Sequence, residues 1–351
     1  MDWRKAIFLG SCLAITVTFY ARAGIGKTPA DSKTASLNRQ LPSLSYTQAM
    51  KAAEAWPKCA QTKGRSGTQC AHWSEGDVSF RLIRIGRGER TTPVIESQSV
   101  QPRPDRIVLY LNGGPDMWPF AYLPDGREAM FRVFYGKRFK VASIAYWGTS
   151  FRTNLEKGEI EAASRDLQAT YNHYAQRCGC RPLVVAESLG ASVLFYTLRQ
   201  HPKAAYRFVA MSPAMRGLQE ALMTFEETTT PKERVFGARR SYLYVRANSQ
   251  AFSYSGPRLV QSFEHMKSFA GQEDNAFAEH LLDDRCSRVI MGSEDHLNRK
   301  YRPPIHERIL VLPGLGHNLD LDADLKSTRT LLEQAIGCHV QQSRAGGGGA
   351  L

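Results

Sequence analysis

Short apolar segments that alternate with helical patterns constrain the fold of this chain more than any other feature of its sequence. The segments expected to be strands are 78–85, 106–115, 140–148, 182–188, 206–213, 288–295 and 308–317. Apolar residues recur at helical spacing between several of them, most clearly in 160–174, 189–202 and 321–337. Strands that are apolar throughout are typical of parallel sheets covered on both faces. The pattern therefore predicts an α/β fold with a mostly parallel central sheet and helices on both faces.

Segments that interrupt this alternation of strands and helices suggest the domain organisation. Residues 215–285 form a long segment of mixed charge that is rich in aromatic side chains, and we expect a helical lid inserted over the carboxyl ends of the strands. The core then consists of two parts, 76–214 and 286–340. Residues 24–75 are expected to be an N-terminal linker with one short helix, and 341–351 a disordered Gly-rich tail.

Residues 1–23 have the three parts of a secretory signal peptide. The basic start MDWRK precedes the apolar run AIFLGSCLAITVTFY, and Ala21-Arg22-Ala23 has the small-x-small pattern of a cleavage site. Two alternatives stay open. The segment LGSC, which ends at Cys12, resembles a lipoprotein box, and the run could be an uncleaved anchor although it is short for a span of about 20 residues. A cleaved signal predicts a periplasmic or secreted protein.

The charge balance is basic, with 46 Lys and Arg against 33 Asp and Glu and a formal net charge of +13. Such an excess favours contact with anionic envelope surfaces. Because the sequence contains no block of Lys and Arg with interleaved aromatic residues, we expect no nucleic-acid partner.

Six cysteines follow the signal peptide: Cys59, Cys70, Cys178, Cys180, Cys286 and Cys338. An even number in an exported protein favours disulfides. Sequence proximity suggests the pair Cys59–Cys70, and the pair Cys286–Cys338 would join the start of a strand to the last helix. The two cysteines of the motif CGC either join each other or take separate partners. No metal site is expected, because the paired C-x-x-C spacing of such sites is missing.

The segment LVVAESLGAS, residues 183–192, ends an apolar strand in a serine between small residues. A nucleophilic serine on a sharp strand-to-helix turn needs small neighbours two positions away on either side, and Ala186 and Gly190 meet this need around Ser188. The alternative is a serine that only caps the following helix. Open α/β sheets bind their ligands at the carboxyl ends of the strands, where Ser188 is expected.

Residues at two later strand ends supply the base and the acid that a nucleophilic serine requires. Asp295 follows an apolar strand in the segment GSED, and His317 follows the last strand in the segment GLGH. We expect Ser188 to be the nucleophile, His317 the general base and Asp295 the acid that orients it. Glu294 is an alternative acid, although it sits one step nearer the strand, where its side chain would point the other way.

An acyl-transfer site also needs hydrogen-bond donors for the oxyanion that develops. The backbone N–H of Leu189, which follows the nucleophile, is the expected first donor. The second is expected in the glycine turn NGGPD after the early strand, from Gly113 or Gly114, and the sequence does not choose between them.

Together these motifs resemble the α/β-hydrolase superfamily over residues 78–337. The GGP after the early strand is also similar to the proline iminopeptidase and tripeptidyl aminopeptidase branch, whose members carry H-G-G-P-G there. This chain has Asn112 in place of that His and Asp116 in place of the last Gly, and its serine motif reads AESLG where the branch has a G-G-S-W-G-like motif. The resemblance implies a Ser-His-Asp triad in an α/β-hydrolase fold.

The sequence therefore predicts an exported serine hydrolase that needs no metal or organic cofactor and acts on a small-molecule or peptide acyl substrate, with an ester favoured over a peptide. An aminopeptidase would need a lid carboxylate for the free amine of its substrate, and Glu226 and Glu227 are the candidates. A non-catalytic binding protein on the same fold is the third alternative. It is disfavoured because such a protein would have little reason to keep Ser188, Asp295 and His317.

Overall fold

The structure is a computed structural model, and all the residues it describes belong to the compact unit Leu41–Leu351. It describes Cys59, 65–75, 78–87, 90–98, 101–111, Phe134, 137–144, 160–201, 206–217, 284–298, Tyr301, 307–317 and 325–345. The expected signal peptide, the glycine turn 112–116 and nearly all of the expected lid lie outside these residues. None of the helices in this described part has the length and apolar character needed to cross a bilayer.

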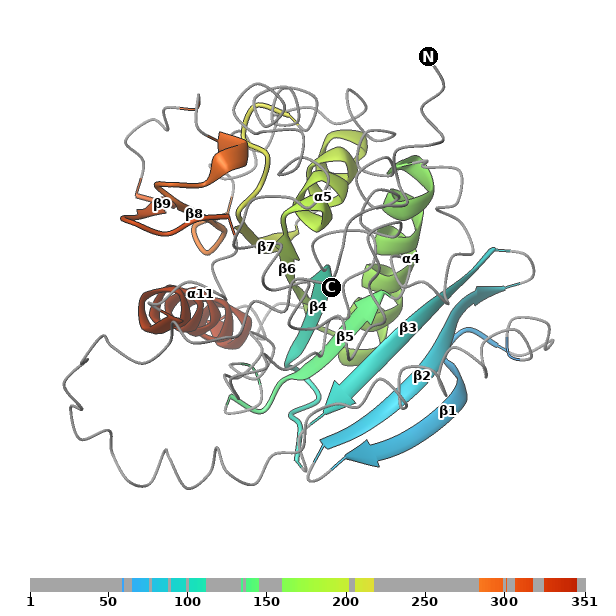
Figure 1. Cartoon of the computed structure of the whole chain (residues 1–351). Helices are drawn as coiled ribbons and strands as arrows, with labels where there is room; N and C mark the ends of the chain where they lie inside the picture. Colours follow the sequence, from blue (N-terminus) through green and yellow to red (C-terminus); the bar gives the residue numbers. More distant parts are fainter. Residues whose placement is uncertain are drawn as a thin grey trace, which may run out of the picture. The chain divides into compact units, whose positions relative to one another are not determined.

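Nine strands of the described chain form one sheet in the order β1-β2-β3-β5-β4-β6-β7-β8-β9 (Figure 1). At one end of the sheet, β1 (Thr68–Glu75), β2 (Val78–Arg87) and β3 (Arg90–Gln98) pair antiparallel, and β3 also pairs antiparallel with β5. All other neighbours are parallel: β5 (Lys140–Ile144), β4 (Ile107–Leu111), β6 (Leu183–Glu187), β7 (Arg207–Met211), β8 (Arg288–Gly292) and β9 (Ile309–Leu312). The prediction of a mostly parallel α/β sheet is confirmed.

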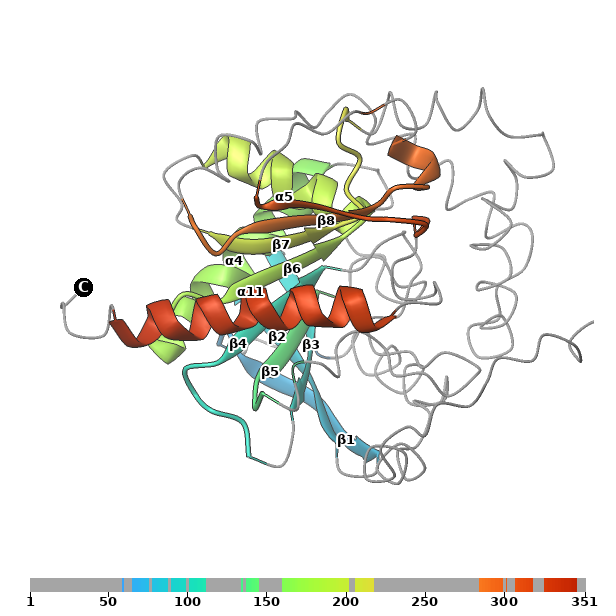
Figure 2. The same ribbon diagram turned by 90° about the vertical axis from the view of Figure 1, so that its left-hand side faces the viewer.

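Helices cover both faces of the sheet. The helices α4 (Ile160–Cys178) and α5 (Leu189–Gln200) lie on one face, and α11 (Leu325–Ala345) lies on the other (Figure 2). Side chains of β6 alternate between these two layers, as successive residues of a strand do. Val184 and Ala186 pack with α4 and α5, whereas Leu183 and Val185 pack with α11. Burial on both faces explains why these strands are apolar throughout.

The structure contains two strands, β1 and β3, that the sequence analysis does not predict. In β3, Pro93 lies inside the strand, where proline argues against a strand in a sequence. In β1, a bulge between Gln69 and Ala71 interrupts the alternation. Because β1 begins at Thr68, the sheet starts before residue 76, the expected boundary of the core.

The last helix is longer than expected. α11 continues to Ala345 and therefore enters the segment 341–351 that was expected to be a disordered tail. Residues 341–345 contain no glycine or proline, and the glycine run begins only at Gly346. The helix therefore meets no strong helix breaker before that point.

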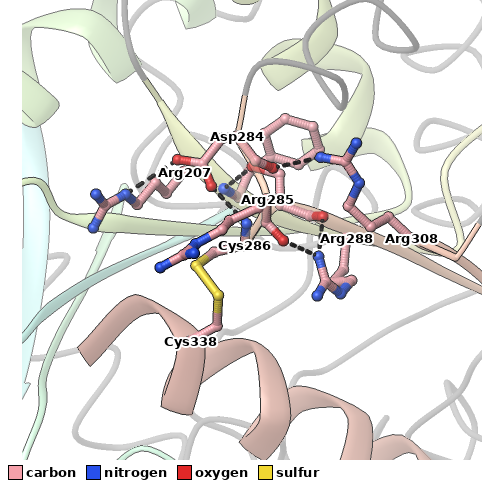
Figure 3. A network of polar contacts seen from close by, with 9 residues as sticks. Arg207, Asp284, Arg285, Cys286, Arg288, Arg308 and Cys338 are labelled. Carbon is pink, nitrogen blue, oxygen red and sulfur yellow. Dashed lines mark hydrogen bonds and ion pairs between the residues drawn. A yellow bond between two sulfur atoms is a disulfide. The ribbon is translucent and has the colours of Figure 1, made fainter. Parts of the chain in front are cut away.

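Three disulfides are present: Cys59–Cys70, Cys178–Cys180 and Cys286–Cys338. The first and third are the pairs that the sequence suggested, and the two cysteines of the CGC motif join each other. Figure 3 shows the polar network around the third disulfide, where β8 begins.

Asp284 organises this network at the amino ends of three strands. Its carboxylate accepts hydrogen bonds from Nε of Arg207 at 3.1 Å and from the backbone N–H of Cys286 at 2.7 Å (Figure 3). Its carbonyl oxygen accepts a hydrogen bond from Nη1 of Arg308 at 2.9 Å. One acidic residue therefore ties the starts of β7, β8 and β9, and the disulfide to Cys338 adds α11.

A buried histidine, His339, lies on the face of α11 that packs against the sheet, with its ring 6.3 Å from that of Phe139. Burial lowers the pKa of His339 to about 4; the charge of Arg207 acts in the same direction, while Asp284 and Asp105 oppose it. The folded protein therefore holds this imidazole neutral at pH values where the unfolded chain protonates it.

We expect the free energy of unfolding to fall as the pH drops from about 6.5 towards 4, because the unfolded state binds a proton that the folded state does not. In His339→Gln this loss between about pH 7 and about pH 4.5 should be smaller by about 2 kcal/mol than in the wild type. Urea unfolding followed by circular dichroism at the two pH values measures the difference. The same pH dependence in both proteins would contradict the neutral state of His339.

Candidate active site

A sharp turn after β6 carries Ser188. Its φ of 48° and ψ of −112° lie where residues other than glycine are rarely found, and α5 begins at the next residue. The N–H of Ser188 donates to the carbonyl of Met211 in β7 at 2.9 Å, and its carbonyl accepts the N–H of Ala191 at 3.0 Å. The hydroxyl makes no hydrogen bond that caps α5. The alternative of a serine that only caps the helix is therefore wrong.

The hydroxyl of Ser188 meets the imidazole of His317 instead. Ser188 Oγ lies 2.8 Å from Nε2 of His317, and Nδ1 of the same ring lies 2.9 Å from Oδ1 of Asp295. The three residues follow β6, β9 and β8, whose carboxyl ends share one edge because these strands are parallel. With a proton on Nδ1 that is donated to Asp295, Nε2 can accept the proton of the serine hydroxyl.

The carboxylate of Asp295 is completely buried, and backbone and amide donors surround it. Oδ1 accepts the N–H of Leu297 at 2.9 Å, and Oδ2 accepts Nδ2 of Asn298 at 2.8 Å. Donors of this kind favour the ionised form of a carboxylate. The neighbouring Glu294 is exposed, so the alternative acid does not face the histidine.

Asn298 fixes the position of Asp295 and was not among the candidates from the sequence. It ends the short 3₁₀ helix η2 (His296–Asn298). Its Oδ1 accepts the N–H of Met215 at 2.9 Å, and its Nδ2 also donates to the carbonyl of Pro213 at 2.8 Å. The buried amide thereby joins the loop after β8 to the segment that follows β7. The only signal in the sequence that could have identified Asn298 is its position three residues after Asp295.

Backbone contacts hold the loop that carries His317 against the end of β8. The N–H of Ser293 donates to the carbonyl of Leu312, and the N–H of Glu294 donates to the carbonyl of Leu315, both at 2.9 Å. The loop passes directly over Gly292, where a Cβ atom would stand only 2.1 Å from the carbonyl oxygen of Leu315. This close approach requires a glycine.

Glu187 is a second buried carboxyl group beside the nucleophile. It ends β6, and its Oε2 accepts a hydrogen bond from the hydroxyl of Tyr110 in β4 at 2.9 Å. Burial raises the pKa of Glu187, whereas the hydrogen bond from Tyr110 and the charge of His317 oppose that shift. The charge of His317 thus acts on Glu187, so the two groups influence each other's protonation. The sequence shows a glutamate directly before Ser188, but it does not indicate that the Glu187 side chain contacts Tyr110.

The end of β7 carries another serine with a positive φ. Ser212 has a φ of 46°, and its N–H donates to the carbonyl of Ile290 at 2.7 Å. Its hydroxyl is buried, and no side chain or backbone group within the described ranges accepts or donates a hydrogen bond to it. Ser212 therefore differs from Ser188, because no imidazole in the part of the chain that the structure describes hydrogen-bonds its hydroxyl.

The remaining candidates are placed only in part. Leu189 is buried in the first turn of α5, whose N–H groups have no partner within the helix. Gly113 and Gly114 lie outside the described residues, but β4 ends at Leu111, which pairs with Ala186 next to the serine turn. Glu226 and Glu227 also lie outside. Over the described ranges, no group of three His, Cys, Asp or Glu side chains is arranged to hold a metal ion.

The strand order, with β5 between β3 and β4, is combined here with a serine turn after β6, an acid after β8 and a histidine after β9. The turn and the order serine, acid, histidine are those of the α/β-hydrolases. The chain has the α/β-hydrolase fold.

Comparisons with known proteins give the following similarities. No protein-family model matches the chain, and no curated protein matches it in sequence. A solved structure from work on carboxylesterases of Nitrososphaera gargenis is 11% identical, with a TM-score of 0.47 over 74% of this chain and 99% of that one. An esterase from Thermogutta terrifontis is 12% identical, with a TM-score of 0.45 over 74% and 99%. A prolyl endopeptidase is 13% identical, with a TM-score of 0.44 over 76% of this chain, which spans 39% of that enzyme.

Gly292→Ala should displace the loop that carries His317, because the added methyl group would overlap a backbone carbonyl that cannot rotate away. We expect a loss of stability of about 1–3 kcal/mol and at least a roughly 10-fold slower reaction of Ser188 with a fluorophosphonate, since a small misplacement of a catalytic group is costly. Gly337→Ala in α11 is the matched control, because nothing lies within 4 Å of its new methyl group. Normal labelling of Gly292→Ala would show that the loop tolerates a side chain there.

Proposed function

We propose that this chain is an exported serine hydrolase that cleaves an acyl ester through a covalent acyl-enzyme. The single observation that supports the proposal is the series Ser188 Oγ, His317 and Asp295, joined at 2.8 Å and 2.9 Å. A hydroxyl, an imidazole and a buried carboxylate in this order are what a nucleophilic serine needs.

In the proposed first half-reaction, Ser188 Oγ attacks the acyl carbon while Nε2 of His317 accepts its proton. Asp295 keeps the imidazole in the required tautomer and stabilises the imidazolium that forms. The N–H of Leu189, with that of Gly113 or Gly114, stabilises the oxyanion of the tetrahedral intermediate. Collapse of the intermediate expels the alcohol, which takes its proton from His317.

In the second half-reaction, water attacks the acyl-enzyme and His317 accepts a proton from it. The second tetrahedral intermediate collapses, Ser188 leaves with the proton held by His317, and the carboxylic acid departs. The chain's own residues perform every proton transfer in this scheme, so it requires no metal or organic cofactor.

An ester is the proposed substrate class in preference to a peptide. The support comes from the sequence, which departs from the aminopeptidase branch at Asn112, at Asp116 and in the serine motif AESLG. The competing peptide substrate depends on Glu226 or Glu227 as the partner of a free amine. Export rests on the signal-like residues 1–23.

A fluorophosphonate probe should label the wild type and fail to label Ser188→Ala, because only a serine with an adjacent base attacks phosphorus at a useful rate. Ser212→Ala is the matched control: it removes a strand-end serine with a similar positive φ whose hydroxyl has no hydrogen-bond partner among the described residues, and labelling should persist. Labelled peptides are identified by mass spectrometry. A wild type that does not react would favour the non-catalytic binding protein.

Turnover of p-nitrophenyl esters of graded acyl length, beside prolyl and alanyl anilides, decides the substrate class. We expect ester hydrolysis that falls by roughly 10³-fold or more in Ser188→Ala. Turnover of anilides alone, with a loss in Glu226→Gln or Glu227→Gln, would replace the ester by a peptide substrate.

Glu187→Gln should move the acid limb of the pH profile of kcat/KM to lower pH, because a nearby carboxylate stabilises the imidazolium of His317. Glutamine keeps an oxygen for the Tyr110 hydroxyl and removes only the charge. Tyr110→Phe serves as the comparison, since it removes the hydrogen bond and leaves the carboxyl group. An unchanged acid limb in Glu187→Gln would mean that Glu187 is neutral while His317 titrates.

A further inference from the structure

The connection between α4 and β6 reads Arg177-Cys178-Gly179-Cys180-Arg181, and its two cysteines form a disulfide with each other. Gly179 and both arginines are exposed, and both cysteines are only partly buried. The hydrolase site uses none of these residues: they precede the start of β6, whereas Ser188 follows its end. The motif is therefore a chemically distinct feature at the other end of the same strand.

The Cys178–Cys180 disulfide contributes little to holding the chain together. The stabilisation from a cross-link grows with the length of chain that it closes. Here the two cysteines are 2 residues apart, compared with 11 for Cys59–Cys70 and 52 for Cys286–Cys338. Cys286 is also fully buried, so a reductant reaches that pair less easily.

Helix α4 has other means of ending and of docking. Gly179 adopts a φ of 58° immediately after the last helical residue, which is the usual way in which a helix terminates. Leu167 and Tyr174 of α4 are buried in the core beneath the helix. Opening of the disulfide therefore leaves both the helix end and its packing in place.

The charges around the motif favour reactive sulfur. Thiolates, rather than thiols, take part in exchange, and neighbouring cationic side chains stabilise them. In the sequence, Arg177 and Arg181 flank the pair, each next to one cysteine. The carboxyl end of α4 acts in the opposite direction, but its partial charge is only about −0.5. The pair is therefore a partly accessible disulfide whose immediate neighbours in the sequence are both cationic.

We propose that Cys178–Cys180 is a thiol–disulfide exchange site that oxidises dithiols, as an activity separate from the hydrolase. A thiolate of the dithiol attacks one sulfur of the pair, the Cys178–Cys180 bond breaks, and the other cysteine leaves as a thiolate. The second thiol of the partner then attacks the mixed disulfide. The partner ends as a disulfide, and Cys178 and Cys180 end as two thiols that have gained two electrons and two protons.

The test compares the three disulfides in the folded wild type. The protein is exposed to dithiothreitol for increasing times, quenched with N-ethylmaleimide and analysed by peptide mass spectrometry, while near-UV circular dichroism follows the fold. We expect Cys178–Cys180 to open at least roughly 10-fold faster than the other two pairs before the near-UV signal changes. Opening at the rate of Cys286–Cys338, or only together with unfolding, would overturn the proposal.

A second measurement follows the oxidation of a synthetic dithiol peptide by stoichiometric protein. Cys178→Ser/Cys180→Ser should lose this oxidation, and Arg177→Gln/Arg181→Gln should slow it several-fold because the leaving thiolate is less stabilised. Ser188→Ala should oxidise the peptide at the wild-type rate, which separates this activity from the hydrolase. Equal oxidation by the Cys178→Ser/Cys180→Ser protein would assign the reaction to another disulfide and overturn the proposal.

Discussion

The positive φ of Ser188 is the constraint on which the candidate site depends. A non-glycine residue in such a conformation costs roughly 1–3 kcal/mol and persists only where its surroundings enforce it. The surroundings here are the hydrogen bond to Met211 in the next strand and the immediate start of α5. Leu189 and Ala191, just beyond the turn, are buried in the core. Core packing thus supplies the free energy that keeps the serine hydroxyl turned away from the helix and towards His317.

The two edges of the parallel sheet have different roles. At the amino edge, Asp284 joins the strand starts through partly buried contacts, an ion pair with Arg207 and a hydrogen bond from Arg308 to its carbonyl oxygen. At the carboxyl edge, Asn298 and the backbone contacts around Gly292 join the loops that carry Asp295 and His317. Both sets of contacts cross between strands that are distant in sequence. The contacts at the amino edge therefore hold the strands to one another. Those at the carboxyl edge hold the loops in fixed positions relative to one another.

The parts of the fold that could be predicted from the sequence are those in which a short run of residues is compatible with only one kind of secondary structure. The buried strands β4, β6 and β7 are mostly apolar, and Ser188, Asp295 and His317 each follow a short run of mostly apolar residues. What could not be predicted depends on contacts between distant residues. β1 and β3 are stable because they pair with β2, although a bulge and a proline weaken their own patterns. The roles of Asn298 and of the Tyr110–Glu187 contact likewise arise only when separate strands are brought together.

The Cys286–Cys338 disulfide encloses a segment that contains both Asp295 and His317, whereas Ser188 lies outside it. Even in an unfolded but oxidised chain, Asp295 and His317 stay on one covalent ring, so bringing them together costs less chain entropy than it would in a linear chain. The serine turn has no such tether and is assembled by β6 and its neighbours alone. Reduction of this one bond therefore lets Asp295 and His317 move further apart in the unfolded ensemble, whereas it does not change the chain around Ser188.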